Sequence, residues 1–448
     1  MSTRALSADR TRPASSSGLL VTLLAAAIFL SYIDRGLLAI AGPLIKDELG
    51  LSATEFGLAV SAFFWIYAPA QLLCGWMVDR FSVYRLFAAG VAIWGAATMM
   101  FGAVEGLLSL VVLRLLLGLG QSFCFPGSSK MIARHCGAEQ RGSANGIVMA
   151  GLAAGQATGA FVGGLIMASF GWRAMCVFFG MVTLLWLLPW RRLTFAAVQN
   201  ESVEAKPVIS HREILRKRAL WGSCAGHFCN NYGFYFLITW LPLYLVSVRG
   251  LTIEWMATLT ALTFAIQTIV AFASGWASDR LVAGGLPEGP VRKAIIVGAN
   301  VVKAGAIIGI AFAESQVALI GWLALTGITI GMTSPQNFAI PQIFAGPFAA
   351  GRWVGMQNFA ANIAGITGPV ITGLIIDATD SYSIAFLLAG AITLASAFFW
   401  GVVVPRVEPI RWQVAAWPVA SRRRSGCGLE RGRLTGHTSG CGGSGGWR

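Results

Sequence analysis

The chain has 448 residues, of which 56% are hydrophobic and only 12% are charged. Soluble proteins carry about 25% charged residues, so this sequence lacks the polar surface that a soluble fold of this length needs. The net charge of +14 lies in short breaks between apolar segments and at both ends of the chain, which argues against nucleic-acid binding. The composition predicts an all-α membrane protein that has the lipid bilayer as its surroundings.

Twelve apolar segments are long enough to cross a bilayer, since a membrane-spanning helix needs about 20 residues. The first six lie near residues 19–41, 56–77, 85–104, 107–131, 144–168 and 173–191, and the second six near 219–245, 254–277, 294–313, 316–344, 353–376 and 383–404. We expect two six-helix bundles, at 19–191 and 219–404. The other stretches predict an N-terminal tail at 1–18, a polar linker at 192–218 and a largely disordered tail, rich in Gly, Arg and Ser, at 405–448.

The distribution of Lys and Arg predicts the orientation in the membrane. With a cytoplasmic N-terminus, the N-terminal tail and the internal loops carry 18 of these residues, and the opposite side carries three, Lys46, Arg173 and Arg249. The C-terminal tail adds eight more. Positive loops face the cytoplasm, so we expect both termini there, in a monomer that crosses the plasma (inner) membrane.

A short motif relates the two halves of the chain. The sequence G-W-M-V-D-R at 75–80 ends the second apolar segment, and G-W-A-S-D-R at 275–280 ends the eighth. The motif residues are Gly75, Asp79, Arg80, Gly275, Asp279 and Arg280. We expect the aspartates to connect neighbouring helix ends on the cytoplasmic side and to set the balance between two conformations.

Charged residues inside apolar segments mark a candidate site. A charge at the centre of a span costs about 2.5–3.5 kcal/mol, so it persists mainly where it faces a polar cavity. Arg35 and Arg114 both lie roughly 10–12 Å below the outer surface, by the helical rise. Two guanidinium groups at matched depth favour an anion site, and structural ion pairs are the alternative. Lys130 and Lys303 are expected to extend to the cytoplasmic surface.

Asp34 directly precedes Arg35 but points about 100° away from it on a helix. In apolar surroundings this carboxyl group can carry a proton, whereas a buried cation beside it would make it structural. The sequence leaves both open.

Neutral polar residues add to the candidate site. They are Tyr67, Gln121, Asn230, Tyr235, Asn358 and Asn362. Gln121 lies two helical turns after Arg114, and Asn358 and Asn362 share a helix face. Neutral amides also join helices to one another, which is the alternative interpretation.

The sequence contains no catalytic pattern. The four histidines are scattered and the eight cysteines lack metal-ligand spacing, so we expect no enzyme activity, no metal and no cofactor. Six cysteines fall in or beside apolar segments and are expected in the core, while Cys427, His437 and Cys441 give only a weak metal signal in the tail.

These motifs resemble the major facilitator superfamily, whose signature in the loop after the second helix is G-x-x-x-D-R-x-G-x-R. Ser82 replaces a usual glycine of that signature. The stretches 31–52, 61–80, 113–136 and 230–245 are similar to the anion:cation symporter family of sugar-acid and organic-anion carriers. The resemblance covers about residues 18–405 and implies two bundles with a binding site between them.

The resemblance also implies roles for individual residues. The arginines Arg35 and Arg114 would bind the anion, Asp34 would handle a coupled proton, and Tyr67, Tyr235 and Asn358 or Asn362 would line the site. Gln121 stands where the family has a glutamate, and Asn230 stands where some relatives have an arginine. The small number of charges therefore suggests a monoanionic substrate.

The leading hypothesis is proton-coupled uptake of a small organic anion, a sugar acid or another carboxylate, by alternating access. An exporter of many lipophilic compounds is one alternative. A membrane protein that senses a solute without transporting it is another.

Overall fold

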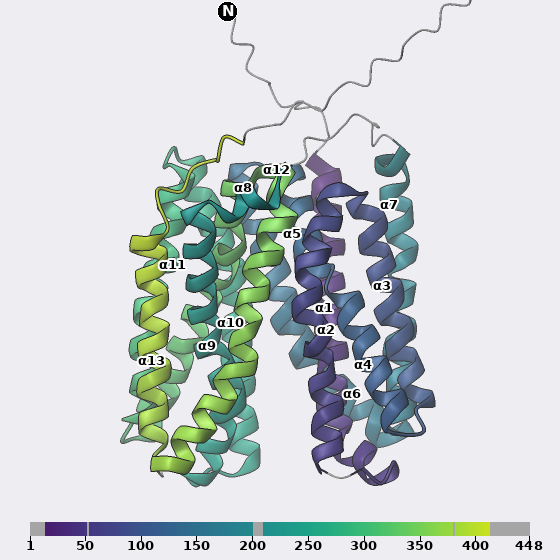
Figure 1. Cartoon of the computed structure of the whole chain (residues 1–448). Coiled ribbons are helices and arrows are strands. Elements are labelled where there is room, and N and C mark those ends of the chain that lie inside the picture. The colour runs from purple at the N-terminus through teal and green to yellow at the C-terminus, as the bar shows by residue number, and fades with distance from the viewer. Residues whose placement is uncertain (1–13, 52, 200–208, 380, 413–448) are drawn as a thin grey trace, which may run out of the picture. The chain divides into compact units, whose positions relative to one another are not determined.

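The computed structural model describes residues 14–51, 53–199, 209–379 and 381–412, and these residues form helices with short connections (Figure 1). The first half contains α1 (Ala14–Glu48), α2 (Ala53–Arg80), α3 (Val83–Met100), η1 (Phe101–Ala103), α4 (Leu107–Gln121), α5 (Cys124–His135), α6 (Ala138–Leu185) and α7 (Leu187–Gln199). The second half contains α8 (His211–Leu215), α9 (Arg218–Ser247), α10 (Ile253–Ala283), α11 (Glu288–Ala311), α12 (Gln316–Thr379), α13 (Tyr382–Phe398) and η2 (Phe399–Val403).

Two helices, α6 and α12, are longer than one membrane span because each contains two. The chain turns inside them at Gly171 (φ 81°) and Gly346 (φ 59°). Glycine reaches positive φ without steric penalty, and both glycines fall between predicted spans. In the described ranges, nine helical runs are long and apolar enough to cross a membrane. Counting α6 and α12 twice and adding the 30-residue α9 confirms the predicted twelve spans in two six-helix bundles.

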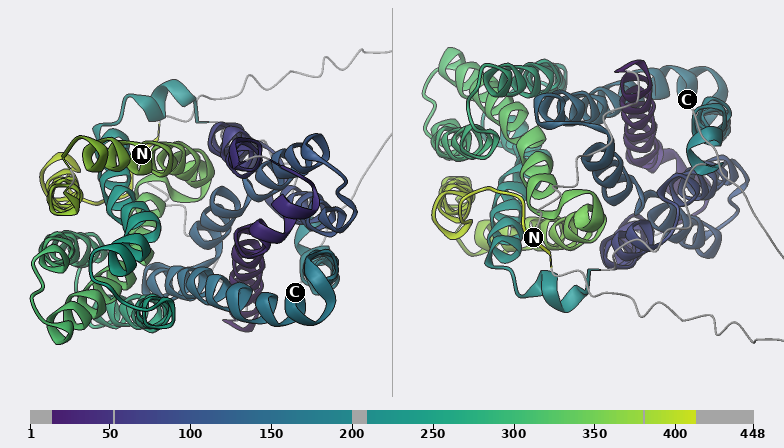
Figure 2. Two further views of the ribbon diagram at one scale, coloured as in Figure 1. Left: turned by 90° about the horizontal axis from the view of Figure 1, so that it is seen from below. Right: turned by 90° about the horizontal axis from the view of Figure 1, so that it is seen from above.

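The hydrophobic cores follow the two halves, which lie side by side when seen along the helices (Figure 2). One core cluster runs from Leu20 to Trp190 and takes only Ala271, Phe338 and Val354 from the second half. Two further clusters lie within the second half. Each half therefore packs around its own apolar interior, and the six described cysteines are buried as expected.

The halves approach each other closely at one end of the bundles, which we call the basic end. It is formed by the α2–α3 connection, α8 and the α10–α11 connection. A Cβ atom on Gly75 of α2 would lie 2.6 Å from the carbonyl oxygen of Gly351 in α12. A Cβ atom on Gly275 of α10 would lie 2.3 Å from the carbonyl oxygen of Gly142 in α6. At these two positions, where α2 crosses α12 and α10 crosses α6, only glycine leaves room for the facing backbone.

Each crossing also uses a pair of glycines four residues apart on the facing helix. Gly355 packs against the backbone of α2, and Gly146 packs against the backbone of α10. The sequences G-R-W-V-G at 351–355 and G-S-A-N-G at 142–146 are thus a second internal repeat, in which small residues let helix backbones approach.

Asp79 links the first half to the second at the basic end. Its carboxylate accepts hydrogen bonds from the backbone N–H groups of Gly351 (3.2 Å) and Arg352 (2.8 Å) in α12. Lys130 of α5 forms a buried ion pair with the same carboxylate at 2.9 Å. Lys130 does lie near the basic end, but it does not extend to the surface as predicted, because Asp79 holds its ammonium group inside.

Asp279 makes the equivalent link in the opposite direction. It accepts hydrogen bonds from the backbone N–H groups of Gly142 (2.8 Å) and Ser143 (2.6 Å) in α6. Arg292 of α11 is fully buried and pairs with it at 3.0 Å. The two motif aspartates therefore do contact the other half of the chain. The motif arginines Arg80 and Arg280 are exposed.

The start of the predicted C-terminal tail is ordered. After η2 the chain crosses the basic end, where the backbone N–H of Ile410 donates to Phe344 (3.2 Å) and the indole N–H of Trp412 donates to the carbonyl of Ala345 (3.0 Å). The rest of that tail, with Cys427, His437 and Cys441, lies outside the described residues. So does most of the predicted N-terminal tail, because α1 begins at Ala14.

We expect the Gly275→Ala substitution to open the basic end, because the added methyl group collides with the backbone of α6. Overpacking of this kind costs about 1–3 kcal/mol, so the closed arrangement should lose roughly 5- to 150-fold in population. Distances between spin labels across the basic end measure the change. Gly305→Ala on α11 is the control, because nothing lies within 4 Å of its added Cβ atom. An unchanged distance distribution in Gly275→Ala contradicts the role given to this crossing.

Candidate functional site

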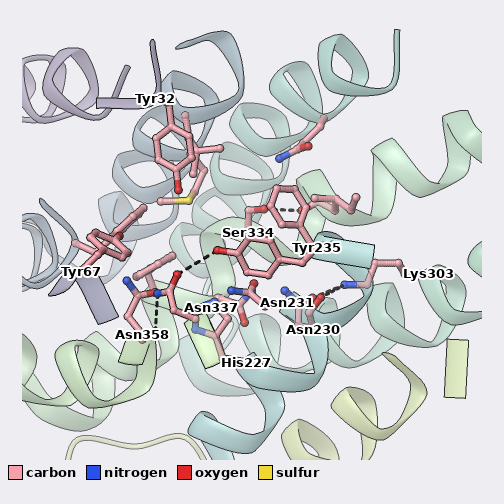
Figure 3. Close-up of a pocket in the computed structure, with 18 residues that line it drawn as sticks. Tyr32, Tyr67, His227, Asn230, Asn231, Tyr235, Lys303, Ser334, Asn337 and Asn358 are labelled. Carbon is pink, nitrogen blue, oxygen red and sulfur yellow. Dashed lines mark hydrogen bonds between the residues drawn. The ribbon is translucent and has the colours of Figure 1, made fainter. Parts of the chain in front are cut away.

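A cavity lies between the two halves and encloses about 610 Å³ of empty space, part of it open to solvent (Figure 3). Helices α1, α2, α5 and α6 line it from the first half, and α9, α10, α11 and α12 line it from the second. Five residues predicted for the site line this cavity: Tyr67, Asn230, Tyr235, Asn358 and Asn362. The other three, Arg35, Arg114 and Gln121, do not line it.

Arg35 lies one side chain behind the cavity wall, in a cage of aromatic rings. Its guanidinium carbon is 4.6 Å from the ring centroid of Tyr32, 4.4 Å from that of Tyr67 and 4.9 Å from that of Phe63. Tyr32 is one helical turn from Arg35 on α1, and Phe63 stacks on Tyr67 one turn along α2 at 4.8 Å. Each cation–π contact of a desolvated guanidinium contributes up to about 2 kcal/mol, so the cage holds this cation against the cavity.

Arg114 and Gln121 of α4 converge on the same cage. Arg114 is buried, and its guanidinium carbon lies 5.3 Å from the centroid of Phe63, the ring that Arg35 also contacts. Gln121 accepts a 2.7 Å hydrogen bond from Nε of Arg35 and donates one to the carbonyl of Ser31 at 3.1 Å. The four first-half residues predicted for binding are therefore neighbours: Arg35, Arg114 and Tyr67 contact the ring of Phe63, and Gln121 joins them through Arg35.

Asp34 points away from this group and into the first bundle. Its carboxylate accepts a hydrogen bond from Thr183 of α6 at 3.3 Å, and Thr98 and Trp94 of α3 face the same group. Its other oxygen, Oδ1, is buried without a hydrogen-bond partner in the described part of the chain. Among those residues no cation lies within ion-pair distance of Asp34, so Arg35 and Asp34 do not form a pair.

The predicted amides of the second half form a short chain of hydrogen bonds. The hydroxyl of Tyr235 donates to Oδ1 of Asn362 at 3.1 Å, and Nδ2 of Asn362 donates to the backbone carbonyl of Asn358 at 2.7 Å. Nδ2 of Asn358 is buried and has no partner among the described residues. Of the two amides, Asn358 therefore has the donor that remains available to a bound molecule.

The prediction for Lys303 is wrong. Its side chain is fully buried and lines the cavity, where Nζ donates to the side-chain oxygen of Asn230. Because α11 starts at the basic end with Glu288, Lys303 lies roughly 22 Å along the helix, at ~1.5 Å per residue. That is farther than a lysine side chain reaches, and counting residues from the helix start would have shown it.

A polar cluster around Gln357, a residue that was not among the predicted site residues, also lies beside Asn358. Nε2 of Gln357 donates to Nδ1 of His227 at 3.1 Å and to the carbonyl of Asn337 at 2.8 Å. His227 and Asn337 line the cavity. Gln357 has no charge or motif that could have revealed it. Its partners lie on α9 and beyond the turn at Gly346 in α12, so only the packed helices bring the three residues together.

Comparison with known proteins agrees with this architecture. The family model of the Major Facilitator Superfamily matches residues 24–365. A probable sulfoacetate transporter of Cupriavidus necator is 31% identical over 395 residues, which cover 83% of this chain and 90% of that protein. A hexuronate transporter of Bacillus subtilis is 29% identical over 397 residues (85% and 92%), and a probable L-galactonate transporter of Escherichia coli is 27% identical over 391 residues (84% and 86%).

Solved structures share the fold. The human organic anion transporter MFSD10 superposes with a TM-score of 0.68 at 14% identity, covering 87% of this chain and all of that one. The transporter FucP in its outward conformation gives a TM-score of 0.67 at 15% identity, covering 86% and 99%. With two six-helix bundles around a cavity and a family match over residues 24–365, the chain is a membrane transporter, not an enzyme, and belongs to the Major Facilitator Superfamily.

Proposed function

We propose that this transporter carries a small organic anion, a sugar acid or a related carboxylate or sulfonate, by alternating access and with a coupled proton. The observation that supports it most is the convergence of Arg35 and Arg114 on Phe63, directly behind the cavity wall. The names of the relatives, which include sulfoacetate, hexuronate and L-galactonate transporters, agree with an anionic substrate.

Arg35 has donors left for a bound anion. A guanidinium group has five N–H donors, and Nε of Arg35 is used by Gln121. Nη2 is buried without a hydrogen-bond partner in the described part of the chain, which is unusual for a buried donor. A carboxylate that reaches between Tyr32 and Tyr67 would accept this hydrogen bond. The bond would be charge-assisted and therefore strong.

The basic end is the natural cytoplasmic face in this proposal, because most of the Lys and Arg residues of the loops are on that side. In that orientation both termini are cytoplasmic in the plasma membrane. The crossings at Gly75 and Gly275 then close the cavity from the cytoplasm, and release of the anion inside requires them to separate. The aspartates Asp79 and Asp279 would hold the closed arrangement until that step.

Asp34 is the best candidate for the coupled proton. It is a buried carboxyl group that accepts a hydrogen bond from Thr183, and no cation in the described part of the chain lies within ion-pair distance of it. Ionisable residues in such positions inside a membrane protein commonly take part in proton relays. Because Asp34 and Arg35 are adjacent on α1, a change in the charge of one would rotate or shift the segment that carries the other.

We expect Arg114→Ala to reduce uptake of labelled carboxylates by roughly 10- to 100-fold, since a hydrogen bond to a charged group contributes about 1.5–3 kcal/mol. Uptake into proteoliposomes measures the effect. Arg212→Ala removes an exposed arginine of α8 and should leave uptake unchanged. Normal uptake by Arg114→Ala would rule out its role in binding.

The Gln121→Glu substitution should make anion binding strongly dependent on pH. When ionised, the new carboxylate pairs with Arg35 and competes with the substrate, so affinity falls at high pH by roughly tenfold or more, the scale of a hydrogen bond to a charged group. As the pH falls, the carboxyl group becomes protonated, Arg35 is released and affinity recovers. Binding titrations from acidic to neutral pH test this. Gln140→Glu on an exposed position is the control, and an unchanged pH profile in Gln121→Glu contradicts the proposed geometry.

Replacing Asp34 by asparagine should separate binding from coupling. The amide keeps the shape and the contact with Thr183 but cannot carry a proton. We expect exchange of labelled anion between two equal pools to continue, while accumulation driven by a pH gradient is abolished. Gradient-driven accumulation that persists in Asp34→Asn assigns the coupling to another group.

A further inference from the structure

Lys303 is a cavity residue with only neutral partners. It is 0% exposed and lies in the cavity wall on α11. Nζ donates to the side-chain oxygen of Asn230 and, at 3.4 Å, to the backbone carbonyl of the same residue. No carboxylate among the described side chains lies within ion-pair distance of it. An ammonium group has three donors, so one remains for an acceptor that the described residues do not provide.

Buried cations at the basic end differ from Lys303 in this respect. Lys130 pairs with Asp79 at 2.9 Å, and Arg292 pairs with Asp279 at 3.0 Å. A buried charge without a counter-ion costs several kcal/mol, and a pair with good geometry offsets most of that cost. Lys130 and Arg292 at the basic end thus have their acids within the protein, whereas Lys303 has none within ion-pair distance in the described part of the chain.

Lys303 lines one side of the cavity, and Arg35 lies behind the two tyrosines that line the other side. Arg35 contacts the rings of Tyr32 and Tyr67, which line it from the first half. Tyr67 and Lys303 lie on opposite sides of the close-up view, with the amides of α9 and α12 between them (Figure 3). A molecule in this cavity therefore has Lys303 on one side and, behind the tyrosine rings of the other side, Arg35. Each of these cations is held by a neutral amide.

We propose that the substrate is a small dianion, with one anionic group bound beside Arg35 and the second bound to Lys303. Dicarboxylates, aldaric acids and sulfonated carboxylates are the compounds of this class. The second anionic group would supply the counter-ion that Lys303 lacks, and Asn230 would position the ammonium group to receive it. The proposal rests on the proposed function and changes its substrate. The sequence suggested a monoanion because Gln121 and Asn230 left few charges in the site, and Lys303 adds a cation that this count did not include.

Three pairs of anions of nearly equal size test the proposal on the purified full-length protein. Each pair contains a dianion and a monoanion: succinate and succinamate, glucarate and glucuronate, sulfoacetate and sulfoacetamide. Isothermal titration at pH 7.5 measures the Kd of each. We expect the wild-type protein to bind at least one dianion about tenfold or more tightly than its monoanionic counterpart, the scale of one added charged hydrogen bond.

Three variants identify the residue responsible. Lys303→Gln removes the charge and should reduce the preference for the dianion to about onefold, mainly by weakening dianion binding. Asn230→Asp places a carboxylate on Lys303 and should abolish the preference in the same way, even if Lys303→Gln fails to fold. Lys293→Gln makes the same change on the same helix, where Nζ bonds the carbonyl of Val404 outside the cavity, and should keep the wild-type preference.

The outcomes separate the inference from the proposed function. If the wild-type protein binds monoanions as tightly as dianions, or if the preference survives in Lys303→Gln and Asn230→Asp, the role of Lys303 is wrong while anion transport stands. If none of the six anions binds the wild-type protein, the proposed function itself fails.

Discussion

The hydrogen bonds that Asp79 and Asp279 accept from backbone N–H groups of the opposite half hold this transporter in its present arrangement. Each aspartate reaches across a contact where only glycine lets two helix backbones meet, and each is held by a buried cation from its own half. A buried carboxylate that accepts hydrogen bonds from backbone N–H groups makes strong bonds. The bundles are therefore joined at the basic end, and the position of the cavity between them follows from this junction.

The cations around the cavity have different partners from the cations at the basic end. At the junction, acids and bases neutralise each other inside the protein. Around the cavity, Arg35 has Gln121 and three aromatic rings as neighbours, and Lys303 has Asn230. Rings and amides hold a cation in place without cancelling its charge, so both remain able to attract an anion. The two halves of the chain share a repeated motif and a similar fold, yet the two sides of the cavity between them differ in chemistry.

Much of the fold could be predicted from the sequence. The twelve apolar segments, the breaks at Gly171 and Gly346 and the repeated G-W-x-x-D-R motif are local signals, since span length and turn chemistry depend on neighbouring residues in the chain. The glycine pairs at 142–146 and 351–355 are also present in the sequence. Their role in close helix contact becomes clear only when the helices that pack against them, α10 and α2, are known. The grouping of Arg35, Arg114 and Gln121 was expected from their depth and helical phase.

The sequence alone determined how deep each charged residue lies and which half contains it, because helical rise and span boundaries are properties of one segment. Only the tertiary structure decided what each charge faces, because that depends on how a helix is rotated against its neighbours. Asp34 and Arg35 are adjacent in the chain, yet one faces Thr183 within the first bundle and the other faces the aromatic cage. Helix rotation also explains why Lys130 pairs with the carboxylate of Asp79, whereas Lys303 donates to the amide oxygen of Asn230. Helix packing determines these partners, because a charged side chain inside a bundle is costly unless the helix opposite provides a polar group.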